Sequence, residues 1–348
     1  MKKLLALTLM PTFYLTCFSY IKSQALASTP TWQYHAPKGA ICRSGSPAGY
    51  FLRTQKNSKK LVIGLGGGGA CFNGITCLGN ANTVSNQRPS DVGILDLRKE
   101  NPTHTWNHAF VPYCTGDAFT GNAKNVHVPG GPRGQHFVGF ANLTIFFNEI
   151  KKKLPNLEKI LLVGVSAGGF GIAFNYDQAN QIFKGSKVLA LDDSGVPFDD
   201  EFMAPCLQRK WRNLWGWKNS LPKDCKECYQ ENGGGIIRYF DYLKEKYPDL
   251  VVGFISSYSD RVIRWFYGFG RRQCRSLFPG MSKAFFRSGL FDAIENQMDT
   301  MMTSFLFKGF SHTHLYEEDF YKVRVDGKSI HSWVADFIDG NAHDVRGY

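Results

Sequence analysis

The sequence predicts an α/β fold in which helices flank a mostly parallel β-sheet. Short apolar runs at 60–65, 161–165 and 187–191 have the continuous hydrophobicity of strands that are buried on both faces. Each run ends in glycine-rich or polar residues, and stretches with helical spacing lie between them. Because we find no internal repeat and no low-complexity linker, we expect residues 28–348 to form a single domain with disulfide-bearing cap insertions.

Residues 1–27 have the pattern of a secretory signal peptide. Two lysines precede an apolar stretch at 4–18, and residues 25–27 form a small-x-small cleavage site. Pro11 interrupts the apolar stretch, which is short for a membrane span, and no later segment is longer. We therefore expect cleavage after Ala27, a secreted or periplasmic protein and no stable membrane anchor. The alternative is an uncleaved membrane anchor.

The predicted elements follow in order along the chain. We expect strands over residues 50–53, 60–65, 109–114, 161–165, 187–191, 251–256 and 304–310. Helical spacing of apolar residues predicts helices over 137–154, directly after Ser166, and over 236–247, 294–302 and 330–338.

Residues 206–228 are rich in tryptophan and cysteine and predict a cap-like insertion. The side chains of Trp211, Trp215 and Trp217 offer aromatic faces on which a sugar ring or an acyl chain can pack. The alternative is that the three tryptophans form a satellite core.

Cysteine usage agrees with export. Removal of the signal peptide takes Cys17 away and leaves eight cysteines, an even number that predicts four disulfides. Cys225 and Cys228 also have the spacing of zinc ligands, but a zinc site needs a second close pair, which the sequence lacks. A thioredoxin-like redox role is disfavoured because that motif opens a helix in a βαβ unit. Cys71 and Cys77 are close enough to bridge a small loop.

The net charge indicates which partners the chain favours. The formal charge is +12 and becomes +9 (12 − 3) once Lys2, Lys3 and Lys22 leave with the signal peptide. The basic residues are scattered and accompany no nucleic-acid-binding module, so we expect no nucleic-acid partner. Excess positive charge favours anionic substrates.

The motif Gly-x-Ser-x-Gly at 164–168 follows a buried-strand pattern and precedes helix-compatible residues. In a nucleophile elbow, the serine lies on a strand-to-helix turn so tight that only glycine fits beside it, and its hydroxyl projects above the sheet. We therefore predict that Ser166 is a catalytic nucleophile. A structural glycine-rich turn and a phosphate-binding loop are the alternatives.

Four glycines, Gly66–Gly69, follow the strand predicted over 60–65. Such a loop can turn backbone amides toward one point, which in acyl-transfer enzymes is the oxyanion. A Walker phosphate loop is excluded because Lys followed by Ser or Thr is missing. A bridge between Cys71 and Cys77 would hold this strand end rigid. Asp117, in a polar loop further on, is a candidate for substrate contact or for a turn.

A serine nucleophile needs a base, and the base needs a carboxylate that fixes its tautomer. Asp260 follows the strand predicted over 251–256, and His312 follows the strand predicted over 304–310. Acid and then histidine, each after a strand, is the order of an α/β-hydrolase. We therefore predict Asp260 as the orienting acid and His312 as the general base.

Several other acidic residues and histidines compete for these roles. Asp192 and Asp193 end the strand immediately after the nucleophile, which is too early for the usual acid. His314 lies two residues from His312, and His331 lies in a predicted helix. We interpret the histidines that precede the nucleophile as surface or turn residues: His104, His108, His127 and His136.

Ordered blocks extend over most of the mature chain. They are Gly39-Ala40-Ile41-Cys42 with Gly45-Ser46-Pro47-Ala48, Gly67-Gly68-Gly69-Ala70-Cys71-Phe72-Asn73 with Cys77, Pro112-Tyr113-Cys114-Thr115-Gly116-Asp117, Gly164-Val165-Ser166-Ala167-Gly168-Gly169, Tyr258-Ser259-Asp260 and Gly309-Phe310-Ser311-His312-Thr313. This set resembles the pectin acetylesterase and Notum family, and the blocks in order are far more specific than any one of them.

The resemblance implies an α/β-hydrolase-like carboxylesterase with Ser166 as nucleophile, Asp260 as orienting acid and His312 as general base. It also implies an oxyanion hole made by the backbone amides of Gly68, Gly69 and Ala167. Many relatives have a tryptophan where Gly69 stands. This departure leaves the backbone amide usable but changes the wall of the pocket.

Family members remove acetyl groups from pectin or a fatty acyl group from a protein, so the resemblance indicates the chemistry better than the substrate. We expect an exported serine esterase that hydrolyses acyl esters through an acyl-serine intermediate, with O-acetyl esters of an acidic polysaccharide favoured. No metal and no organic cofactor is implied, and the sequence does not indicate the oligomeric state. The alternatives are a Notum-type esterase for longer acyl chains and a non-catalytic polysaccharide-binding module.

Overall fold

The computed structural model describes residues 30–84, 88–276 and 279–347. The chain divides into two compact units, Met1–Pro30 and Thr31–Tyr348, and the fold described here is that of the second. The predicted signal peptide over 1–27 lies outside the described residues.

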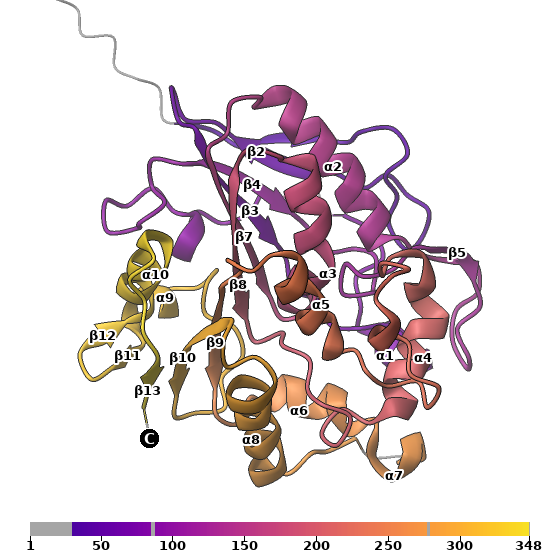
Figure 1. Ribbon diagram of the computed structural model, residues 1–348. Helices are drawn as coiled ribbons and strands as arrows, with labels where there is room; N and C mark the ends of the chain where they lie inside the picture. The colour runs from indigo at the N-terminus through magenta and orange to yellow at the C-terminus, as the bar shows by residue number, and fades with distance from the viewer. Residues whose placement is uncertain (1–29, 85–87, 277–278, 348) are drawn as a thin grey trace, which may run out of the picture. The chain divides into compact units, whose positions relative to one another are not determined.

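A nine-stranded, mostly parallel sheet organises this unit (Figure 1). The first two strand pairs, at one edge, are antiparallel, and all the other pairs are parallel. The predicted α/β fold with a mostly parallel sheet flanked by helices is confirmed. In spatial order the strands are β1 (Gln33–His35), β2 (Tyr50–Arg53), β4 (Asn107–Val111), β3 (Lys60–Leu65), β7 (Lys159–Val165), β8 (Lys187–Asp193), β9 (Val252–Ser257), β10 (Met302–Phe307) and β13 (Val345–Arg346).

Helices cover both faces of the sheet (Figure 1). On one face lie α2 (Gly139–Lys153), α3 (Ala167–Ile182) and α5 (Arg238–Lys246), and on the other lie α9 (Asp319–Lys322) and α10 (Ile330–Asp339). The central strands are continuously apolar because they are covered on both sides.

Helix α2 shows how the sequence pattern produces this packing. Its buried residues Leu143, Phe146, Phe147 and Ile150 recur at the spacing of one helical face. Fully burying each such side chain stabilises the fold by about 1.5–3 kcal/mol. Substituting Phe147, which is fully buried, with alanine would therefore cost about 3–5 kcal/mol.

Among the helices of the described residues, none has the length and apolar composition needed to cross a bilayer.

The other helices and strands are short or belong to connections between the strands of the large sheet. The remaining elements are α1 (Gly74–Leu78), η1 (Gly93–Leu95), β5 (Ala123–Val126), β6 (Gln135–Phe137), α4 (Pro205–Trp215), η2 (Trp217–Asn219), η3 (Lys226–Cys228), α6 (Arg261–Gly268), α7 (Arg271–Cys274), α8 (Lys283–Asp292), η4 (Ala293–Gln297), β11 (Arg324–Val325) and β12 (Lys328–Ser329).

Four disulfides pair the eight cysteines of the described residues, as predicted. The short one closes the loop after the glycine-rich segment, and another ties α4 to α7. Because Cys225 and Cys228 are bonded to each other, the zinc alternative for this pair is wrong. The pairs are Cys42–Cys114, Cys71–Cys77, Cys206–Cys274 and Cys225–Cys228.

The helix predicted over 294–302 is present only over its first residues and is wrong beyond residue 297. The chain is π-helical over Ala293–Gln297, as a continuation of α8, and strand β10 already begins at Met302. Met298 and Met301 are buried in the turn that precedes β10. Their burial accounts for apolar residues at a spacing that is also typical of a helix. Strand β10 ends at Phe307 rather than at residue 310, before the bend at Gly309, whose φ is +151°.

The interpretation of His108 as a surface or turn residue is also wrong. His108 lies in β4 and is fully buried. Its Nδ1 lies 2.7 Å from Nη2 of Arg53, and its Nε2 lies 3.2 Å from Oγ1 of Thr103. Burial and the neighbouring Arg53 lower the pKa of His108 to about 3, so the ring is neutral and structural.

Candidate active site

Ser166 lies on the turn between β7 and α3. Its backbone has φ 57° and ψ −117°, a conformation that non-glycine residues rarely adopt. A Cβ on Gly164 would lie 2.2 Å from the carbonyl oxygen of Gly168, and a Cβ on Gly168 would lie 2.3 Å from that of Leu65. Glycine is therefore required on both sides of the serine. The amide of Ser166 donates to the carbonyl of Asp193 over 2.8 Å, which ties the turn to β8.

A small apolar pocket of about 30 Å³ lies beside Ser166. Since a single water needs roughly 10–15 Å³ on this scale, the pocket holds a group of only a few non-hydrogen atoms. Ser166 itself is 7% exposed. Residues from five parts of the chain line the pocket, among them Gly69, Ala118, Ala167, Trp211, Trp215, Ile263 and Phe266.

The tryptophans of the cap-like insertion are buried, as the satellite-core alternative predicted, and their packing against a substrate stays a prediction. Trp211 and Trp215 of α4 are buried in the core and also line the pocket beside Ser166. Trp217 is fully buried and donates from Nε1 to Oγ1 of Thr120 over 2.7 Å, which is a packing role.

The glycine-rich loop after β3 borders the same pocket. A Cβ on Gly67 would lie 3.2 Å from the Cβ of Ser166, so the loop passes directly beside the serine. Within the described residues, the amides of Gly68 and Gly69 donate to no protein acceptor. The amide of Ala167 has no intrahelical acceptor because this residue begins α3. The three residues predicted for an oxyanion hole thus carry uncommitted donors close to Ser166.

Asp260 and His312 are in direct contact. Oδ2 of Asp260 lies 2.7 Å from Nδ1 of His312. The other oxygen accepts from the amides of Val262 and Ile263 over 2.8 and 3.0 Å, so the carboxylate also caps α6. Asp260 is fully buried, whereas the His312 side chain is 15% exposed. A buried carboxylate on Nδ1 fixes the imidazole tautomer and leaves Nε2 to act on a substrate.

The topology brings the three predicted catalytic residues to one edge of the sheet. Strands β7, β8, β9 and β10 are adjacent and parallel, so their carboxyl ends coincide. Ser166 follows β7, Asp260 follows β9 and His312 follows β10. Among the contacts of the described residues, no hydrogen bond joins Ser166 to His312. In ligand-free hydrolases this contact is often long and shortens when a substrate binds.

A second Asp–His pair, Asp193 and His314, lies nearby and is completely buried. Nδ1 of His314 lies 3.3 Å from Oδ1 of Asp193, and Nε2 lies 3.0 Å from the hydroxyl of Ser311. Oδ2 of Asp193 accepts from the amides of His314 and Leu315 over 2.5 and 2.9 Å. His314 therefore has no free ring nitrogen, which explains structurally why it is the weaker candidate for a base.

The other competing residues have structural contacts. Asp192 accepts from the amide of Gly195 over 2.8 Å, and burial and Asp193 raise the pKa of Asp192 well above its usual range. Asp117 is fully buried and holds a turn through Thr115 and backbone amides. Its role in a turn, rather than in substrate contact, agrees with these bonds. His331 lies in α10, as predicted.

Some residues at the site were not singled out from the sequence. The ring of Phe266 lies where a side chain at position 69 would be, since a Cβ on Gly69 would lie 3.0 Å from its Cζ. Asn80 and Tyr113 bond to carbonyls of the glycine-rich loop. They are 12 and 44 residues from the carbonyls they bind, so no local pattern reveals these contacts. The one available signal is that Tyr113 falls in the block 112–117.

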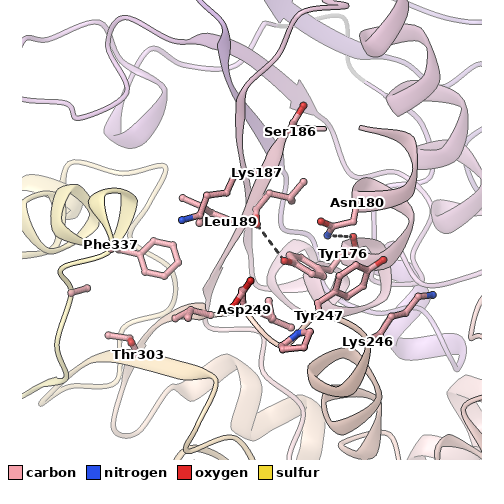
Figure 2. Close-up of a pocket in the computed structure, with 16 residues that line it drawn as sticks. Tyr176, Asn180, Ser186, Lys187, Leu189, Lys246, Tyr247, Asp249, Thr303 and Phe337 are labelled. Atoms are coloured by element: carbon pink, nitrogen blue, oxygen red, sulfur yellow. Dashed lines mark hydrogen bonds between the residues drawn. The ribbon is translucent and has the colours of Figure 1, made fainter. Parts of the chain in front are cut away.

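A larger groove lies at the end of the sheet opposite to the one where Ser166 lies. It has a volume of about 790 Å³ and is lined at the amino ends of the strands by residues such as Lys187 and Thr303 (Figure 2). Tyr176 and Tyr247 face it from α3 and from the residue after α5 (Figure 2). Ser166 is at the carboxyl end of β7, so this groove is separate from the pocket described above. Across the described residues, no group of three or more His, Cys, Asp or Glu side chains is arranged to hold a metal ion.

Comparisons with known proteins agree with this architecture. A model of the pectinacetylesterase family matches residues 22–238. The palmitoleoyl-protein carboxylesterase notum1a of Danio rerio is 30% identical over 220 residues, which are 54% of this chain and 42% of the relative. The palmitoleoyl-protein carboxylesterase NOTUM of Drosophila melanogaster is 26% identical over 318 residues, which are 84% of this chain and 46% of the relative. The chain thus spans less than half the length of these relatives.

A solved structure, that of the Wnt deacylase Notum from Drosophila, superimposes with a TM-score of 0.69 and 23% sequence identity. The superposition covers 91% of this chain and 96% of that chain. This likeness confirms the α/β-hydrolase-like fold. The family match covers more than half of the 348 residues. The resemblance expected from the ordered sequence blocks is therefore confirmed, and the chain belongs to the pectinacetylesterase family.

Proposed function

We propose that this chain is an exported serine carboxylesterase that hydrolyses short acyl esters. Ser166 is the nucleophile, His312 the general base and Asp260 the orienting acid. The observation that carries the proposal is the contact between a buried Asp260 and a partly exposed His312, at the sheet edge where Ser166 lies on a strained turn. Family membership supports the same chemistry.

The reaction proceeds in two halves. In the first, Nε2 of His312 takes the hydroxyl proton of Ser166 while the oxygen bonds to the ester carbonyl carbon. The tetrahedral oxyanion is stabilised by the amides of Gly68, Gly69 and Ala167, and its collapse breaks the bond to the alcohol, which leaves with the proton from His312. In the second half, water attacks the acyl-serine by the same route and releases the acid. The positive charge that develops on the imidazole of His312 is stabilised by the neighbouring carboxylate of Asp260, which is buried.

The size of the pocket supports an acetyl group as the acyl part. The cavity beside Ser166 measures about 30 Å³, and Phe266, Trp211 and Ile263 are among the residues that line it. An acetyl group has few non-hydrogen atoms, so its size suits such a volume. The relatives are palmitoleoyl-protein carboxylesterases, so a Notum-type preference for long acyl chains is the competing proposal.

We also propose the alcohol part of the ester, the location of the protein and the extent of its domain. The basic net charge supports an acidic polysaccharide as the alcohol part of the ester. Disulfides form in oxidising compartments, so the four bridges support a secreted or periplasmic location after removal of residues 1–27. Residues 28–348 then form a single esterase domain.

The test combines labelling with a substrate series. The mature chain is expected to hydrolyse p-nitrophenyl acetate faster than the butyrate, octanoate and palmitate esters, and to release acetate from acetylated pectin. A fluorophosphonate is expected to label Ser166, and Ser166→Ala is expected to lose both labelling and turnover. Retained turnover in this variant would reject the mechanism. A wild-type chain that binds polysaccharide but is neither labelled nor active would instead indicate the binding module, and a rate maximum at palmitate would indicate the long-chain esterase.

A further inference from the structure

The two peptide groups that flank Gly69 are each held by a buried side chain. Nδ2 of Asn80 donates to the carbonyl oxygen of Gly68 over 2.8 Å. The hydroxyl of Tyr113 donates to the carbonyl oxygen of Gly69 over 2.9 Å. In a trans peptide the carbonyl and the N–H point in opposite directions, so a bond that fixes the carbonyl also fixes the direction of the next amide. The conformation between the two peptides has φ +78°, which glycine adopts without strain.

We propose that Asn80 and Tyr113 are positioning residues that aim the backbone amides of Gly69 and Ala70 at the oxyanion formed on Ser166. This inference rests on the proposed function and adds the Ala70 amide to the expected donors. Asn80 fixes the amide of Gly69, and Tyr113 fixes the amide of Ala70. Both amides lack a protein acceptor within the described residues, and Gly69 and Ala70 line the pocket beside Ser166. An oxyanion hole stabilises charge only when its donors are aimed beforehand.

The contacts of Tyr113 commit the hydrogen of its hydroxyl to a single hydrogen bond. The oxygen accepts from the amide of Ala118 over 2.6 Å, so its hydrogen is committed to the carbonyl of Gly69. Burial and the nearby Asp117 raise the pKa of Tyr113 well above its usual range, so the phenol keeps this hydrogen at neutral pH. The ring packs against the loop, since a Cβ on Gly68 would lie 2.4 Å from its Cδ1.

The surroundings of Asn80 point to the same role. Nη2 of Arg43, which is buried, donates to the backbone carbonyls of Asn80 and Cys77 over 2.8 and 3.2 Å. The Cys71–Cys77 disulfide anchors the same segment to the end of the glycine-rich loop. Oδ1 of Asn80 is buried and has no hydrogen-bond partner among the described residues. An unpartnered buried acceptor costs about 1–3 kcal/mol. Within the described residues, the one side-chain hydrogen bond of Asn80 is thus the one that its amide donates to the glycine-rich loop.

The experiment uses Tyr113→Phe, which removes only the hydroxyl, and Asn80→Asp, which replaces the donor by an oxygen that repels the carbonyl. Each variant is expected to lower kcat for p-nitrophenyl acetate by about 10- to 100-fold, less than the loss of a donor itself, which costs about 10²–10³-fold. KM should change by no more than about two-fold. The affinity for a trifluoromethyl ketone, which mimics the tetrahedral intermediate, should fall by the same factor as kcat.

Two matched control variants change residues near the amino ends of the strands, away from Ser166. Tyr176→Phe removes a buried hydroxyl that donates to the carbonyl of Val188 over 3.3 Å (Figure 2). Asn107→Asp replaces a buried amide that donates to the carbonyls of Ser58 and Lys60. Both controls should keep the kcat of the wild-type protein, even where the melting temperature falls.

The outcomes separate this inference from the proposed function. Wild-type kcat and unchanged ketone affinity in the Tyr113 and Asn80 variants, with only the melting temperature lowered, would overturn the positioning role while Ser166 remains the nucleophile. An equal loss of kcat in the controls would overturn it as well, because the effect would then follow from general destabilisation. If Ser166→Ala stays fully active, the proposed function itself fails, and the positioning role with it.

Discussion

Two Asp–His pairs lie close together in this molecule and have opposite surroundings. In Asp260–His312 the carboxylate oxygen lies 2.7 Å from Nδ1 and the imidazole is 15% exposed. In Asp193–His314 the corresponding distance is 3.3 Å and both side chains are fully buried. The second pair also binds Ser311 and the backbone of Leu315, so each of its polar atoms has a partner inside the protein.

An Asp–His contact can serve as a catalytic unit only when one ring nitrogen remains free, so the difference supports the proposed role of the first pair. His312 uses Nδ1 for Asp260 and leaves Nε2 available to a substrate or to Ser166. His314 has no such nitrogen, and its pair joins the loop after β10 to the end of β8. We therefore expect changes in the first pair to affect the rate and changes in the second to affect stability.

The largest effect is expected from His312→Ala. Without its base, Ser166 is a poor nucleophile, and kcat for p-nitrophenyl acetate should fall on the order of 10⁶-fold, as for the loss of a base in other triads. Stability in urea should fall less than in a His314 variant, because His312 is partly exposed and water can take its place beside the buried carboxylate of Asp260. Activity that persists in this variant but disappears in a His314 variant would reverse the assignment of the two pairs.

The next largest effect is expected from Asp260→Asn. Asparagine keeps a side-chain oxygen that can cap α6, so the fold should be retained. The amide no longer holds the imidazole in the required tautomer, and kcat should fall about 10⁴-fold. Circular dichroism and an unchanged melting temperature would serve as the control for folding. A loss of less than ten-fold would mean that this carboxylate does not orient the base.

A change in the buried pair Asp193–His314 should lower stability and leave kcat nearly unchanged. His314→Gln keeps a polar side chain of similar length but removes the partner of a buried carboxylate, so the free energy of unfolding should fall by about 3–5 kcal/mol. At a temperature where the variant is folded, kcat should stay within about three-fold of the wild-type value. Urea unfolding and steady-state kinetics measure the two quantities on one preparation. A large loss of kcat with normal stability would contradict a structural role.

The smallest effect is a dependence of stability on pH. Burial lowers the pKa of His314, but the charge and hydrogen bond of Asp193 outweigh it, so the pKa is raised above 6.5. Burial raises the pKa of Asp193, but His314 and the backbone amides outweigh it, so the pKa is lowered below 3.8. A raised pKa of histidine contributes stability that is full below about pH 6.5 and is lost as the pH rises through the value in the folded state.

The corresponding contribution of Asp193 is full above about pH 3.8 and is lost as the pH falls through its lowered pKa. The difference in unfolding free energy between the wild-type protein and His314→Gln should therefore be largest near pH 5–6 and should shrink toward pH 9. Urea midpoints at several pH values measure this difference. A difference that grows toward alkaline pH would contradict the charged state of the pair.

Much of the fold could be predicted because the local pattern decides it. The apolar runs that became β3, β7 and β8 are buried on both faces, so their hydrophobicity is continuous and easy to read. The turn at Ser166 could be predicted because glycine is sterically required at two fixed positions around it. The boundary at residue 28 remains a prediction.

What could not be predicted depends on contacts between distant segments. Nothing local distinguishes Met302, which begins a strand, from the end of an apolar helix, because pairing with β9 decides it. The sequence predicts His108 at the surface because its burial depends on Arg53, which lies 55 residues away in the chain. The catalytic roles of Ser166, Asp260 and His312 follow from motif order and remain proposals, although the structure brings the last two into contact.

The two oxygens of Asp260 link His312 to a wall of the pocket beside Ser166. One oxygen faces the base, and the other begins α6, whose residues Ile263 and Phe266 form a wall of the pocket. Because the helix start is tied to the carboxylate, the face of α6 can change in sequence while the acid keeps its position. If the proposed function holds, smaller side chains at positions 263 and 266 should admit bulkier esters without a change in Ser166, Asp260 or His312.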